Sequence, residues 1–150
     1  LNAVGWRDIA LILSKRNGTI QRTKHLAGPG ADNAGDMAVF ADTSVVVVGS
    51  FNCEGTEEEG CFGPRDVSTG ALDSVVPALQ SIGDKKDIFV AVVGESGSFK
   101  LLLSAGSDEN DYAQAVAPLD DDDGGMLVAG YFCHTGGTIQ QTGECTATFD

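Results

Sequence analysis

Short extended segments, rather than helices, account for the pattern of apolar and polar residues along this chain. Runs rich in apolar and β-branched residues alternate with turns that contain Gly, Asp or Asn, which is the pattern of β-strands. Residues 71–81 come nearest to a helical pattern, but Pro77 in their middle, after Val75 and Val76, favours an extended strand. The pattern therefore predicts an all-β chain. The expected strands are residues 9–13, 19–26, 37–41, 44–51, 88–93, 98–105, 113–119 and 126–132.

The strand pattern occurs twice, about eighty residues apart. Residues 8–20 return as residues 87–99, at an offset of 79, and residues 48–51 return as 129–132, at an offset of 81. An insertion of two residues within 120–123 accounts for the change of offset. A fixed period of this kind is typical of repeat proteins, whose units stack on one another to bury their apolar faces.

We expect each repeat to form one antiparallel meander of four consecutive strands. The two repeats occupy residues 1–52 and 87–150, and residues 53–86 form an insertion and a connecting strand between them. The second repeat ends before a counterpart of residues 66–86 can follow, so we expect the chain to be a segment of a longer protein.

Four phrases in the second repeat carry a family resemblance: Asp87-Ile-Phe-Val-Ala, a Leu-Leu pair before Ala105-Gly106, Asp111-Tyr-Ala-Gln-Ala-Val-Ala, and Leu127-Val-Ala-Gly-Tyr-Phe. They resemble the SBBP-type β-propeller repeat, which implies that each repeat is a four-stranded blade. The first repeat matches more loosely, the repeats here are longer than those of the family, and the Trp of the family's second strand is missing. Because a propeller typically has four to eight blades, the resemblance implies that further blades come from missing sequence or from partner chains.

Charge and hydropathy narrow the classes of partner. The chain has 150 residues and a formal net charge of −13, so nucleic acid and anionic membranes are unsuitable partners, whereas cationic partners and divalent ions suit it. A hydrophobic fraction of 42% argues against disorder. No apolar run approaches the roughly 18 to 20 residues that span a bilayer, so we expect no membrane insertion.

The four cysteines lie at equivalent places in the two repeats. Cys53 and Cys133 follow the last strand of each repeat, and Cys61 and Cys145 each follow a polar loop that contains glycine. Equivalent positions predict equivalent bonds, Cys53–Cys61 and Cys133–Cys145, and hence an extracellular or cell-surface protein. A zinc site is disfavoured because the gaps between the cysteines are longer than in zinc knuckles.

Asn17 begins the sequence Asn-Gly-Thr, which supports two interpretations. It matches the acceptor pattern for N-glycosylation, in agreement with secretion. Asn-Gly between two extended runs also predicts a hairpin turn, and the second repeat keeps Gly97 at this place while losing the acceptor pattern.

The residues that could carry chemistry are few. His25 and His134 lie at different points of the two repeats, without a motif around them, so we expect surface or loop positions. Asp32, Asp36, Asp108 and Asp111 fall in loops rich in Gly, Asp and Asn and are weak candidates for calcium ligands, as is the run 120–123, although the spacing of an EF-hand is absent. Apart from calcium we expect no cofactor.

These observations predict a non-catalytic structural or adhesive module that contacts other blades or subunits of the same assembly. The alternative is a module that binds carbohydrate or calcium through its loops. A carbohydrate site needs clustered aromatic residues, and Trp6, Phe62, Tyr112 and Tyr131 are scattered along the chain.

Overall fold

The computed structural model describes residues 3–53, 60–67, 69, 71–72, 76–82, 84–119, 125–134 and 148–149. These residues form strands, turns and loops without a helix, which confirms the predicted all-β class. None of the described segments is a helix with the length and hydropathy needed to cross a membrane. The strands are β1 (Ile9–Ser14), β2 (Ile20–Ala27), β3 (Asn33–Val39), β4 (Val45–Phe51), β5 (Gly63–Arg65), β6 (Asp87–Val93), β7 (Phe99–Gly106), β8 (Asn110–Pro118), β9 (Met126–His134) and β10 (Thr148–Phe149).

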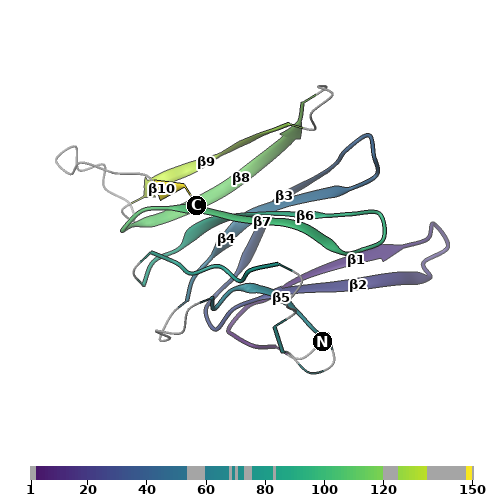
Figure 1. Ribbon diagram of the computed structural model, residues 1–150, viewed down its shortest axis with the longest axis horizontal. Helices are drawn as coiled ribbons and strands as arrows, with labels where there is room; N and C mark the ends of the chain where they lie inside the picture. Colours follow the sequence, from purple (N-terminus) through teal and green to yellow (C-terminus); the bar gives the residue numbers. More distant parts are fainter. Residues whose placement is uncertain are drawn as a thin grey trace.

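The described strands form three antiparallel sheets that lie in layers (Figure 1). The first sheet has the order β1-β2-β5, the central sheet β10-β7-β6-β4-β3, and the third sheet β8-β9. One apolar core lies between the first and the central sheet, and a second core lies between the central and the third sheet. The central sheet is therefore covered on both faces.

The prediction that β1 to β4 form one meander is wrong. The four-stranded meander in the structure is β3-β4-β6-β7, which takes two strands from each repeat. The connection from β2 to β3 leaves the first sheet instead of turning back beside β2: Asp32 accepts a hydrogen bond from the Gly28 backbone N–H (2.7 Å), and the Gly30 carbonyl accepts one from the Trp6 N–H (3.0 Å). The outer edge of β2 pairs with β5. The central sheet therefore combines strands from both repeats, and the division of the chain into residues 1–52, 53–86 and 87–150 stays a prediction.

In the part of the chain that the structure describes, each repeat has five strands rather than four. β5 pairs with β2 through Pro64↔Leu26 and Gly63↔Ala27. β10 pairs with β7 through Phe149↔Ala105 and Thr148↔Gly106, and these two β7 residues are the counterparts of the two β2 residues, 79 positions later. Each repeat thus ends with a very short strand that returns to the outer edge of its own second strand.

The predicted hairpin turns are present in both repeats. Gly18 and Gly97 have φ angles of 84° and 81°, a left-handed conformation that glycine adopts without strain. The Gly18 N–H donates to the Lys15 carbonyl at 2.9 Å, and the Gly97 N–H donates to the Gly94 carbonyl at 2.7 Å. Asn17 is exposed in the first turn, where its side chain accepts the Thr19 N–H, and its glycosylation stays a prediction.

The double covering of the central sheet explains the unbroken apolar run of β4. Val47 and Phe51 face the first sheet, whereas Val46 and Val48 face the third. Successive side chains of a strand point to opposite faces, so a strand that is buried on both faces has apolar residues at consecutive positions.

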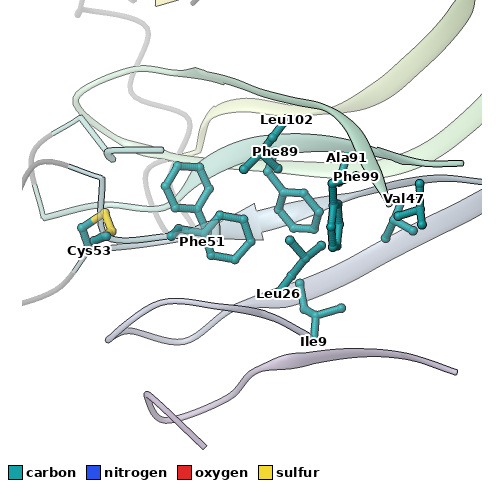
Figure 2. Close-up of a cluster of buried hydrophobic side chains, with 12 residues drawn as sticks. Ile9, Leu26, Val47, Phe51, Cys53, Phe89, Ala91, Phe99 and Leu102 are labelled. Carbon is teal, nitrogen blue, oxygen red and sulfur yellow. A yellow bond between two sulfur atoms is a disulfide. The ribbon is translucent and has the colours of Figure 1, made fainter. Parts of the chain in front are cut away.

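Three phenylalanines form the centre of the first core. The rings of Phe51 and Phe62 stack with centroids 4.6 Å apart, and the centroids of Phe62 and Phe89 are 5.1 Å apart. Figure 2 shows Leu26 and Ile9, from the first sheet, packing against this cluster. Because Phe62 belongs to the segment between the repeats, the cluster fixes that segment to both sheets.

The disulfide Cys53–Cys61 lies at the edge of the same core, with the pairing that the repeat predicted (Figure 2). The Cys53 N–H donates to the Ser81 hydroxyl (3.0 Å), and the Ser81 N–H donates to the Cys53 sulfur (3.2 Å). The second predicted bond, Cys133–Cys145, involves a residue outside the described part of the chain.

The segment predicted as an extended strand, 71–81, is not helical in its described residues. It contributes isolated bridges rather than a regular strand, Leu72 to Arg65 and Leu79 to Phe62. The described residues of the segment, 71–72 and 76–81, therefore lie beside β5 and the disulfide and form no strand of the three sheets.

Replacing Cys53 by serine and Cys61 by alanine is expected to lower the free energy of unfolding by about 2.5 kcal/mol, because the unfolded chain regains the entropy of a short closed loop. Urea unfolding of wild type and variant without reductant measures the difference. With reductant the difference should largely disappear. An equal difference under both conditions would show that the effect comes from altered packing and not from the disulfide.

Candidate functional site

Buried aspartates recur at equivalent places in the two repeats. Asp32, which directly precedes β3, and its counterpart Asp111, near the start of β8, are 2% and 0% exposed. Asp32 accepts the Gly28 N–H and Asp111 accepts the Ser107 N–H, both at 2.7 Å. The same bond thus closes the same loop in both repeats, which gives these carboxylates a structural role.

A second pair of aspartates stands at the entry to β1 and β6. The Asp8 carboxylate accepts the Val4 N–H (2.8 Å), and the Asp87 carboxylate accepts the Ile82 N–H (2.6 Å). Each bond holds the chain that leads into the first strand of a repeat. These bonds explain why the sequence match between the repeats starts at an aspartate.

Burial changes the acidity of one carboxyl in each repeat. Desolvation raises the pKa of Asp32 to about 7, and the nearby Asp8 carboxylate adds to the rise. Desolvation likewise raises the pKa of Asp87 to about 7, with a further rise from Asp111. One oxygen of Asp32 and one of Asp87 are buried without a hydrogen-bond partner, which is consistent with carboxyls that are costly to ionise.

Three of the four candidate calcium ligands accept hydrogen bonds from separate backbone N–H groups. Asp32 and Asp111 close their own loops, and Asp36 accepts the N–H groups of Met37 (2.8 Å) and Val116 (3.0 Å), which ties β3 to β8. Asp108 is exposed. Among the described residues, no group of three or more His, Cys, Asp or Glu side chains is placed to hold a metal ion. Residues 120–123 lie outside the described part.

The expectation of a surface histidine is wrong for His25. This residue lies in β2, is 2% exposed, and places Nε2 3.1 Å from Oδ2 of Asp8. It lies between β1 and β5, opposite Ala10 on one side and Arg65 on the other. Because the sequence of β5 has no recognisable strand pattern, the sequence did not indicate that β5 would pair with β2 beside His25 and bury it. The side chain of His134 is outside the described residues.

Two open depressions lie near the start of β3. Arg7, Asp8 and Asp32 are among the residues that line the first, and Asn33, Ser50 and Tyr112 are among those that line the second. The carboxylates of the first depression, Asp8 and Asp32, are among those that accept backbone N–H groups, and the second depression has no carboxylate in its lining. Neither lining brings a nucleophile and a base together in the described structure, so they offer no clear catalytic arrangement.

Two of the four aromatic residues that are scattered in the sequence, Tyr112 and Tyr131, lie side by side in the fold. Tyr112 of β8 and Tyr131 of β9 are cross-strand partners in the third sheet, and the Lys86 ammonium lies 5.6 Å from the Tyr112 ring centroid. Trp6 is 84% exposed and Phe62 is buried in the core. The predicted scatter of aromatic residues therefore holds for two of the four.

The outer sheets expose apolar residues at positions that are buried in the central sheet. In the third sheet, Leu127 is 62% exposed and Phe132 is 42% exposed, whereas their counterparts in β4, Val46 and Phe51, are fully buried. In the first sheet Ile12 is 56% exposed, whereas its counterpart Ala91 in β6 is fully buried. These exposed strands, β1 and β9, are the candidate functional surface.

Comparison with family models, curated proteins and solved structures found no match to this chain.

Proposed function

We propose that this chain is a non-catalytic structural module of an extracellular or cell-surface assembly and acts through protein–protein contacts on its first and third sheets. The observation that carries the proposal is the exposure of apolar residues on β1 and β9 at positions that are buried in the central sheet. Full burial of one large aliphatic side chain contributes about 1.5 to 3 kcal/mol. If a neighbouring sheet covered these residues, the burial of several such side chains would stabilise the complex.

Strand edges support the same conclusion. Within the described structure, β1 pairs only with β2, and β9 pairs only with β8. A long apolar edge strand is a template for pairing with another strand. A protein partner that adds a strand would satisfy the backbone groups and cover the apolar side chains at once.

Two features support a blade-like unit and a secreted location. Propeller blades are built from four-stranded antiparallel meanders, so the meander β3-β4-β6-β7 and the face-to-face stacking of the sheets support the proposal of a blade-like unit. The disulfide Cys53–Cys61 is typical of oxidising compartments.

Site-specific photo-crosslinking in the organism that makes the protein tests the proposal. A photoreactive phenylalanine analogue replaces Leu127 on β9 in one variant and Met37 on β3 in the control, because both residues are similarly exposed, at 62% and 57%. We expect protein crosslinks from position 127 well above those from position 37. Equal or absent crosslinking from position 127 would contradict a contact function for this surface.

A further inference from the structure

We infer that the partner of these surfaces is a second copy of this chain, bound head to tail, with β9 of one copy paired antiparallel to β1 of the next. The inference rests on the proposed contact function and names its partner. It follows from the strand inventory of the three sheets, from the pairing already present within the chain, and from the exposure of the residues involved.

The two outer sheets are complementary parts of the central sheet. The central sheet, in the order β10-β7-β6-β4-β3, contains the first, second and fifth strands of the second repeat and the third and fourth strands of the first. The first sheet, β1-β2-β5, contains only the first, second and fifth strands of a repeat. The third sheet, β8-β9, contains only a third and a fourth strand. Placing β9 beside β1 of a second copy completes a five-stranded sheet with the strand order of the central one.

The edges that would meet are the counterparts of two edges that already pair. β4 uses one edge for β3 and the other for β6, and β6 uses its second edge for β7. β9 uses the corresponding first edge for β8, and β1 uses the corresponding second edge for β2. Among the described strands, the edge of β9 that pairs with no other strand therefore corresponds to the edge with which β4 binds β6. The edge of β1 that pairs with no other described strand corresponds to the edge with which β6 binds β4.

This correspondence fixes the register of the contact. In the central sheet the pairs are Val46↔Val92, Val47↔Ala91 and Val48↔Val90. Adding the offset of 81 to the β4 residue numbers and subtracting the offset of 79 from the β6 residue numbers gives the equivalent pairs between β9 of one copy and β1 of the next. The expected pairs are Leu127↔Leu13, Val128↔Ile12 and Ala129↔Leu11.

The exposed side chains fit this register. Leu127 and Leu13, which would lie opposite each other, are 62% and 52% exposed, whereas their counterparts Val46 and Val92 are 0% and 9% exposed. Ile12 is 56% exposed, and its counterpart Ala91 is fully buried. The exposed large apolar side chains of β9 and β1 thus lie at positions whose counterparts in the central sheet are buried.

Each copy carries one surface of each kind, so the contact is heterologous and continues from copy to copy. It gives a ring if the rotation between copies closes and a filament if it does not. Each contact needs β9 of one copy and β1 of another, so blocking the same strand on every copy would stop assembly. A copy blocked on β1 and a copy blocked on β9 would still form one dimer, through β9 of the first and β1 of the second.

Two variants make this test. Ile12→Lys blocks β1 and Leu127→Lys blocks β9. Each places a charge at a position that is solvent-exposed in the single chain but whose counterpart in the central sheet is fully buried. Circular dichroism and melting curves should therefore show folded proteins. Val39→Lys on β3, at a site 60% exposed and outside the proposed contact, is the matched control.

Sedimentation velocity should show that wild type and Val39→Lys assemble alike. Self-association of each blocked variant alone should be weakened by about 100-fold or more. An equal mixture of the two blocked variants should form dimers. A mixture that stays monomeric, or a blocked variant that assembles like wild type, would overturn the inference. If self-association fails in this way while position 127 still crosslinks to a different protein, the proposed contact function stands with another partner. If position 127 gives no such crosslinks, both the contact function and the self-association are contradicted.

Discussion

Replacing Phe51 by alanine is expected to lower the free energy of unfolding by about 3 to 5 kcal/mol, the usual cost of deleting a buried aromatic ring. Phe51 is fully buried, stacks on Phe62 with centroids 4.6 Å apart, and lies between the first and the central sheet (Figure 2). The truncation leaves a cavity where Phe62 has lost its neighbour, and the segment between the repeats loosens with it. Urea unfolding followed by circular dichroism measures the loss.

The repeat supplies the matched control for this prediction. Phe132 is the counterpart of Phe51 on β9, but it is 42% exposed whereas Phe51 is fully buried. Phe132→Ala should therefore cost about 1 kcal/mol or less at concentrations where the chain is monomeric. Equal costs for the two replacements would contradict the assignment of one as core and the other as surface.

Stability is expected to fall as the pH rises from about 4 to about 7. The carboxyls of Asp32 and Asp87 have pKa values of about 7 in the folded chain, raised by burial from the ordinary value of 3.8. Within this window the folded state keeps protons that the unfolded chain has released, so the unfolded state binds fewer protons and the free energy of unfolding decreases with pH. Each carboxyl contributes on the order of 1 to 3 kcal/mol across the window, and the loss is complete above about pH 7.

Asparagine variants separate this effect from the repulsion within a chain of net charge −13, which acts in the same direction. Asp87→Asn, and Asp32→Asn in turn, should flatten the dependence of the free energy of unfolding on pH between 4 and 7. Asp42→Asn is the control: hydrogen bonds from Ser44 lower the pKa of the Asp42 carboxyl to about 2, below the window. If the Asp87 variant keeps the full wild-type slope, that residue is not the source.

Local sequence was sufficient to predict the eight longer strands but not their partners. The hairpins at Gly18 and Gly97 depend on a few adjacent residues, and both are present. The pairing of β4 with β6 joins strands that are separated by the whole segment between the repeats, and nothing in the apolar pattern of either strand specifies it. The predicted meander therefore started at the wrong strand, although the strands themselves were placed within a few residues.

Short strands and buried polar groups were missed for a related reason. β5 is a Gly-Pro-Arg tripeptide and β10 has two residues, so neither has a length over which alternation can be recognised. The burial of His25 depends on β5, and its contact with Asp8 depends on the pairing of β1 with β2. The repeated aspartates were noticed as candidate ligands because the sequence shows their type and spacing, whereas their bonds to loop N–H groups appear only in the folded chain.

The sedimentation equilibrium of the wild-type chain, over concentrations from about 1 µM to a few hundred µM, tests most directly whether the outer sheets are association surfaces. Because each copy has an unmatched β1 edge and an unmatched β9 edge in the described structure, the mass should rise with concentration to dimers and larger assemblies. A single monomer mass over the whole range would contradict self-association through these sheets.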